Sequence, residues 1–310
     1  MPTYTNTSNI EVATPQTALR LIESADNHLG NDYINYNLVI AISYSGKTEE
    51  IKRIYETCLR YNLTFILITG ANKEELQNFY KENELVKIIS YYNASDNTGF
   101  EKSFVSLFST LAPCILFYNL ITYSLGTKID NFITESIKIS KSAIKCFPIS
   151  KLGYCIKKCP IIHLFYDWNT YSVALDIESK FIESGIANVI LHEKKNFAHG
   201  RATILYKQDF GLIINLVKYD DGGDYYGETF QTEYDFELSK YLKDLCKEKN
   251  SHYFEICETL GYDDMWNLRI LFTIAYLTVA LGEKLGIDIS NPITPYPKET
   301  ILLYNYKGIF

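Results

Sequence analysis

The sequence predicts an α/β protein built on parallel sheets, and two observations lead to this class. First, short continuous apolar runs recur along the chain, at 37–42, 63–69, 86–92, 161–166 and 210–217. Such runs are typical of strands that are covered on both faces. Second, the runs alternate with longer segments of helical period, and this alternation predicts strand–helix–strand units with parallel strands.

The first half of the chain begins with a short strand expected over 8–14. Pro15 suits the first turn of a helix that is expected to run to about His28. After the strand 37–42 the period becomes helical from Thr48. Three further helices are expected over 74–82, 103–127 and 128–143.

The segment 103–127 carries no charged residue and is long enough to span a bilayer. Serine, threonine and asparagine residues interrupt it, however, and Pro113 lies inside it. These residues favour a helix buried within a sheet protein over a membrane span, so no membrane partner is expected.

The second half repeats the alternation after a segment at 145–160 that has no clear period and holds two prolines. We therefore predict two domains, 1–145 and 146–310. Strands are expected over 161–166, 188–191, 210–217 and 253–257, and helices over 170–184, 196–201, 234–247 and 265–285.

Composition narrows the functional classes. A length of 310 residues suits two domains, and 47% hydrophobic residues suffice for full cores. The net charge of −7 argues against nucleic acid as a partner. The seven cysteines are scattered, and Cys155, Cys159 and His163 give only a weak metal pattern, so no metal is expected. Without a leader motif, a cytoplasmic protein with free thiols is expected.

A candidate anion site follows the strand 37–42. Ser43, Tyr44, Ser45, Gly46, Lys47 and Thr48 lie between the strand and the next helix. Free N–H groups and the positive end of the helix dipole point at such a turn. The hydroxyls of Ser43, Ser45 and Thr48 can donate to phosphate oxygens, Gly46 allows close approach, and Lys47 adds a charge. The alternative is a capped helix without a ligand.

The pattern S-x-S-G-x-T-x-E, formed here by Ser43, Ser45, Gly46, Thr48 and Glu50, resembles the phosphate loop of sugar isomerase (SIS) domains. The resemblance implies a parallel sheet that binds a phosphorylated sugar. It also implies that Glu101, at the start of a later helix, faces the sugar; the alternative is a solvated first turn of that helix. SIS domains normally begin with a further strand and helix, which the first domain here is expected to lack.

A second constellation lies in the other half. On the helix 170–184, Asp176, Lys180 and Glu183 flank an apolar stripe, and His199-Gly200-Arg201 follows sixteen residues after Glu183. Taken alone, Lys180 and Glu183 are most simply interpreted as a surface ion pair, and a lone histidine is most often structural.

Together these residues resemble the second SIS domain of the glucosamine-6-phosphate synthase family. The resemblance implies that Glu183 shuttles a proton between sugar C1 and C2, that Lys180 tunes this transfer, and that His199 from a neighbouring subunit helps to open the ring. Arg201 replaces the family's proline and could hold an anionic group. Neither a metal nor a cofactor is implied.

The resemblance therefore implies tandem SIS-like domains in a homodimer that binds a sugar phosphate or amino sugar phosphate. The expected function is an aldose–ketose isomerase or a deaminase. The alternative is a non-catalytic phosphosugar sensor that controls a partner protein; it would bind the sugar phosphate and leave it unchanged.

Overall fold

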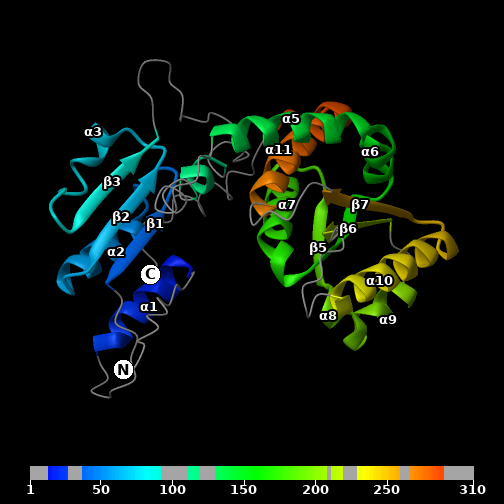
Figure 1. The fold of residues 1–310 in the computed structure, drawn as a ribbon, viewed down its shortest axis with the longest axis horizontal. Helices are drawn as coiled ribbons and strands as arrows, with labels where there is room; N and C mark the ends of the chain where they lie inside the picture. Colours follow the sequence, from blue (N-terminus) through cyan, green and yellow to red (C-terminus); the bar gives the residue numbers. More distant parts are fainter. Residues whose placement is uncertain are drawn as a thin grey trace, which may run out of the picture. The chain divides into compact units, whose positions relative to one another are not determined.

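The computed structural model describes residues 13–26, 37–91, 111–116, 118, 130–207, 211–218, 229–258 and 266–289. Over these residues it confirms the predicted fold class, with two parallel sheets flanked by helices (Figure 1). The chain divides into two compact units. The first comprises Met1–Glu101 and Phe108–Leu116, and the second comprises Lys102–Leu107 and Phe117–Phe310.

The first unit contains a sheet with the order β1-β2-β3, in which both strand pairs are parallel. Thr64 of β2 pairs with Leu38 of β1, and Phe65 pairs with Val86 of β3. The elements are α1 (Pro15–Asp26), β1 (Leu38–Ile42), α2 (Glu49–Arg60), β2 (Thr64–Thr69), α3 (Lys73–Leu76) and β3 (Val86–Ser90).

The core of the first unit lies between α2 and the sheet. Ile51, Ile54 and Cys58 of α2 are buried, as their helical spacing predicts. Phe65 of β2 is fully buried and packs edge-to-face against Tyr55, with ring centroids 5.6 Å apart. This packing holds α2 against β2 of the sheet.

The structure differs from the sequence prediction for 74–82, where α3 ends at Leu76. Tyr80 turns inward, and its hydroxyl donates a hydrogen bond to the carbonyl oxygen of Gly46. The tertiary contacts of this buried ring override the helical propensity of the segment. As a consequence, the residues after α3 support the candidate loop instead of forming a surface helix.

The second unit contains a parallel sheet with the order β5-β4-β6-β7. The chain passes from β4 to β5 on one side and then to β6 on the other side of β4. In open parallel sheets, ligands bind outside the carboxyl ends of the strands at such a reversal. The strands are β4 (Ile161–Tyr166), β5 (Asn188–Glu193), β6 (Leu212–Lys218) and β7 (His252–Glu258).

Helices and two short turns complete the second unit (Figure 1). Helix α5 packs against α11, so it lies with the second unit, whereas the sequence-based domain bounds assign most of it to the first domain. The elements are α5 (Asp130–Cys146), α6 (Ile149–Lys158), the 3₁₀ turn η1 (Trp168–Thr170), α7 (Tyr171–Glu183), α8 (Lys194–Asn196), the π-helical turn η2 (Phe197–Arg201), α9 (Ala202–Lys207), α10 (Thr229–Glu248) and α11 (Trp266–Leu285).

Helix α6 lies within 145–160, the segment in which no clear period was found and the domain boundary was expected. It begins directly after Pro148 and ends before Pro160, so both prolines lie outside the helix. Leu152, Cys155 and Ile156 form its buried face. A segment that was expected to link domains is therefore part of the second unit's core.

Some predicted features lie outside the described residues. These are most of the strand at 8–14, most of the helix at 103–127, and Glu101. No helix among the described ranges is long and apolar enough to cross a membrane.

Candidate functional site

The candidate anion loop forms a tight turn between β1 and α2. The carbonyl oxygen of Tyr44 accepts hydrogen bonds from the N–H of Gly70 at 3.0 Å and from Oγ1 of Thr69 at 2.9 Å. Gly46 has φ +61°, and a Cβ at this position would lie 3.1 Å from Oγ1 of Thr69 and 3.2 Å from Cδ2 of Leu67. Glycine is therefore required here by both backbone conformation and space.

The hydroxyl oxygens of the loop accept hydrogen bonds from its own backbone. Oγ of Ser43 accepts from the N–H of Gly46 at 3.2 Å, and Oγ of Ser45 accepts from the N–H of Lys47 at 3.3 Å. Since a serine hydroxyl has one proton and two lone pairs, accepting these bonds leaves the proton to be donated outward. The loop thus presents hydroxyl donors on a fixed backbone.

Thr48 occupies the N-cap position of α2, with extended φ −68° and ψ 149°, but its side chain makes no capping hydrogen bond. The alternative interpretation of the loop as a hydroxyl-capped helix start is therefore not realised at Thr48. The side chains of Ser45 and Thr48 are exposed. The first N–H groups of α2 and the Thr48 hydroxyl together form an arrangement that can receive an anion.

The charged side chains around the loop offer little net attraction for an anion. Lys47 forms an ion pair with Glu75 of α3, so its ammonium is not directed solely at the loop. Glu49 and Glu50 occupy the first turn of α2, where they favour the helix dipole but repel an anion. Anion binding here would therefore depend on neutral N–H and O–H donors more than on net positive charge.

Helix α7 carries the other sequence-predicted residues, and two of them are more buried than expected. Lys180 is only 3% exposed and forms an ion pair with Asp176 one turn earlier. Burial raises the pKa of the Asp176 carboxyl, while Lys180 lowers it. Oε1 of Glu183 instead accepts a hydrogen bond from Oγ of Ser179 at 2.6 Å. The structure therefore pairs Lys180 with Asp176 and not with Glu183.

Glu183 and the turn that carries His199 lie at opposite ends of the strands of the second sheet. Helix α7 runs back from the carboxyl end of β4, so its last residue, Glu183, lies near the amino end of β5. His199 and Arg201 belong to η2, which follows the carboxyl end of β5. A helix of this length separates the two ends by about 20 Å. A site that uses both residues would therefore need two copies of the chain.

A cluster at the carboxyl edge was not predicted from the sequence. Tyr166 and Glu193 are the last residues of β4 and β5 and pair in register. Burial raises the pKa of the Tyr166 phenol, the Glu193 carboxylate raises it further, and Arg201 lowers it. Arg201 is exposed, and its Nη1 donates to the carbonyl oxygen of Leu191 at 2.9 Å. The sequence signal that could have indicated this cluster is the presence of polar residues at the ends of adjacent parallel strands.

Behind this edge, His163 of β4 and His192 of β5 form a buried pair. Nδ1 of His163 lies 2.9 Å from Nε2 of His192, and the side chain of His192 stacks on Phe165. Burial lowers the pKa of both histidines, and that of His192 falls to about 4 with a further contribution from His163. The described residues contain no group of three or more side chains that could hold a metal ion.

The histidine pair predicts a loss of stability in acid. The unfolded chain takes up protons on these histidines below about pH 6.5, whereas folded His192 does so only near pH 4. Protonation therefore favours the unfolded state as the pH falls through this range. For His192 the free energy of unfolding decreases by roughly 3 kcal/mol in total. Urea unfolding at pH 7 and pH 4.5 should show a smaller loss in His192→Gln than in the unsubstituted protein. Equal losses would contradict the prediction.

No protein family and no curated protein matches this sequence. Solved structures do resemble it. Glucosamine-6-phosphate deaminase from Thermotoga maritima has a TM-score of 0.57 at 15% identity, covering 88% of this chain and 78% of its own. Tagatose-6-phosphate ketose/aldose isomerase from Escherichia coli has a TM-score of 0.59 at 13% identity, covering 92% and 84%.

The C-terminal domain of glucosamine-fructose-6-phosphate aminotransferase from Francisella tularensis is also similar. Its TM-score is 0.54 at 15% identity, covering 88% of this chain and 81% of that one. At these identities the similarity shows that the fold is shared.

Proposed function

We propose that the protein binds a phosphorylated sugar or amino sugar and acts as an aldose–ketose isomerase or a deaminase. The observation that carries the proposal is the loop 43–48, in which Gly46 sets a tight turn and Thr48 makes no capping hydrogen bond. The proteins of similar fold support it, because they are named as a sugar phosphate isomerase, an amino sugar phosphate deaminase and an aminotransferase domain. The proposal includes tandem SIS domains over 1–145 and 146–310 and a cytoplasmic location.

In this proposal each site residue has one task. Ser43, Ser45 and Thr48 hold the phosphate through hydroxyl and backbone donors. Glu183 moves a proton between C1 and C2 of the sugar, since isomerisation needs a base that removes and returns one proton. His199 assists ring opening, and Lys180 sets the charge near the proton transfer. Glu101 and Arg201 are further candidates for contacts with the sugar.

The proposal is tested by incubating the protein in heavy water with a panel of hexose and hexosamine 6-phosphates and following the products by NMR. An isomerase or deaminase exchanges the C2 proton with deuterium and forms product. Binding of a sugar phosphate without exchange or product would contradict the enzyme and favour the alternative, a phosphosugar sensor. The separation of Glu183 and η2 within one chain is the observation that favours this alternative.

The proposed site predicts that the active protein is at least a dimer. Glu183 and His199 can share a site only when they come from different copies, because within one chain they lie at opposite ends of the strands. Light scattering at micromolar concentration is expected to give a mass of two chains or more. A strict monomer that still turns over a sugar phosphate would remove His199 from the site of Glu183.

A further inference from the structure

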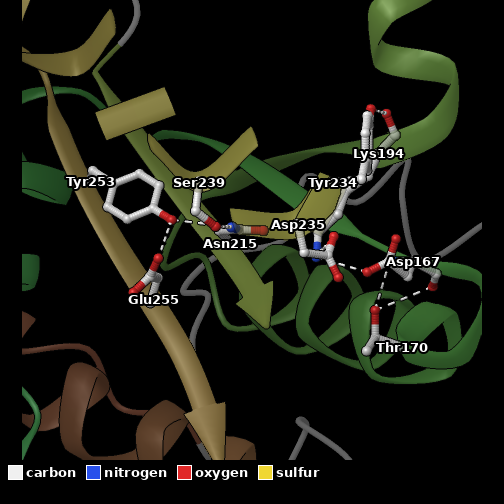
Figure 2. A network of polar contacts seen from close by, with 9 residues as sticks. All are labelled: Asp167, Thr170, Lys194, Asn215, Tyr234, Asp235, Ser239, Tyr253 and Glu255. Carbon is white, nitrogen blue, oxygen red and sulfur yellow. Dashed lines mark hydrogen bonds and ion pairs between the residues drawn. The ribbon is translucent and has the colours of Figure 1, made fainter. Parts of the chain in front are cut away.

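A buried cluster of charges lies at the carboxyl edge of the second sheet (Figure 2). Nζ of Lys194 is 2.7 Å from Oδ2 of Asp167 and 3.1 Å from Oδ1 of Asp235. The side chain of Lys194 is fully buried, and those of Asp167 and Asp235 are 7% and 11% exposed. We refer to Lys194, Asp167 and Asp235 as the ion triad.

The ion triad joins three elements at the reversal of strand order. Asp167 directly follows β4, Lys194 directly follows β5, and Asp235 lies on α10, which comes after β6. The backbone of Lys194 is also held, because its carbonyl oxygen accepts a hydrogen bond from the hydroxyl of Tyr234 at 2.8 Å. The side chain of Lys194 is therefore fixed by Asp167 and by Asp235 of α10, and its main chain is fixed by Tyr234 of α10.

Stability alone is a weak reason for burying these charges. Taking charges out of water is costly, and apolar side chains of similar volume often stabilise a core as well as a buried ion cluster does. Two carboxylates surround one ammonium, and burial raises the pKa of the Asp235 carboxyl although Lys194 lowers it. The triad instead fixes the position of Lys194, since charged hydrogen bonds at these distances allow few alternative positions of its side chain.

The position of Lys194 matters because it is anchored just before the turn η2. Only two residues separate it from Phe197, where η2 begins, and η2 carries His199 and Arg201. Phe197 is buried and packs edge-to-face on Phe165, with ring centroids 4.7 Å apart. The ion triad on one side and this aromatic contact on the other hold the entry to the turn.

We propose that Lys194 is a positioning residue, through which the ion triad sets the backbone of η2, the turn that carries His199 and Arg201. This inference rests on the proposed function for its consequence in catalysis. Its structural consequence, an ordered turn, stands independently of any reaction. The two consequences can be measured separately.

The test uses the full chain and three variants. Lys194→Met leaves both carboxylates buried without their cation. The triple variant Asp167→Asn, Lys194→Met and Asp235→Asn removes all three charges while retaining side chains of similar shape. The control is Lys195→Met, which removes the same charge from the adjacent, exposed residue of α8.

For each variant, thermal melting, deuterium uptake by the amides of 197–202 and the kinetics with an active sugar phosphate are measured. We expect Lys194→Met to melt well below the unsubstituted protein and the triple variant to recover most of this loss. In the recovered triple variant, uptake at 197–202 should still be about tenfold faster, because local opening follows the loss of local contacts. The control should match the unsubstituted protein in all three measurements.

With an active substrate, kcat of the triple variant should fall at least about tenfold while KM stays within about threefold, as expected for a group acting after binding. A triple variant with unchanged uptake at 197–202 overturns the positioning role and leaves the triad as part of the core. If no sugar phosphate is turned over by the unsubstituted protein, the proposed function fails, and the uptake measurement alone decides on Lys194. Faster uptake with unchanged kcat would support the ordering of η2 by the triad and overturn its consequence for catalysis.

Discussion

Replacing Ser45 and Thr48 together by alanine is expected to weaken the binding of a sugar phosphate by roughly 10²–10⁴-fold. Each hydroxyl that donates to a charged phosphate oxygen contributes about 1.5–3 kcal/mol, and two such bonds are lost. The fold should tolerate the change, because both side chains are exposed and Thr48 does not cap α2 through its hydroxyl. The free energy of unfolding is therefore expected to change by less than about 1 kcal/mol.

Isothermal titration calorimetry measures the affinity, and urea unfolding measures the stability of the same preparations. Thr17→Ala is a matched control, since it removes an exposed hydroxyl from α1 of the same unit. The control should bind the sugar phosphate as the unsubstituted protein does. An unchanged affinity in the Ser45→Ala, Thr48→Ala variant would assign the loop to the fold alone and withdraw the phosphate site.

The sequence was sufficient to predict the strands and the loop because these features depend on local patterns. Continuous apolar runs predicted β1, β2, β4 and β6 to within a residue or two, and the change of period at Thr48 predicted the start of α2. The loop was predictable because a glycine among hydroxyl residues, placed between a strand and a helix, is typical of a tight anion-binding turn. The positive φ of Gly46 agrees with the tight turn, and anion binding by the loop stays a prediction.

The features that the sequence could not predict depend on contacts between distant residues. Tyr80 ends α3 early because its ring is buried in the core and its hydroxyl reaches Gly46, thirty-four residues away. No local pattern distinguishes Lys194 from a surface lysine, and only the folded sheet brings it between Asp167 and Asp235. Taken alone, Lys180 was most simply interpreted as a surface partner of Glu183, whereas the packing of α7 buries it beside Asp176.

Replacing Glu183 by glutamine is expected to slow turnover by roughly 10²–10⁴-fold, which is the usual contribution of a general base. The amide retains the shape of the carboxyl group, and its oxygen can still accept the hydrogen bond from Ser179. Binding of the sugar phosphate should change no more than about threefold, because the phosphate is held by other residues. Exchange of the C2 proton with deuterium should disappear together with turnover.

Glu248→Gln provides the matched control, because Glu248 is also the last residue of a helix in the second unit and is exposed. It should leave turnover unchanged. If Glu183→Gln also leaves turnover and C2 exchange unchanged in an active protein, the base is another residue.

A mixing experiment then tests whether Glu183 and His199 act from different copies. Glu183→Gln and His199→Ala should each be inactive alone. If a site takes Glu183 from one copy and His199 from the other, a mixed dimer contains one site with both residues intact. When the two variants are mixed in equal amounts and their subunits exchange randomly, roughly a quarter of all sites should contain both residues intact. Recovery of activity on mixing would explain how residues at opposite ends of the strands of one sheet cooperate. If both single variants are active and mixing adds no activity, Glu183 has only a structural role at the end of α7.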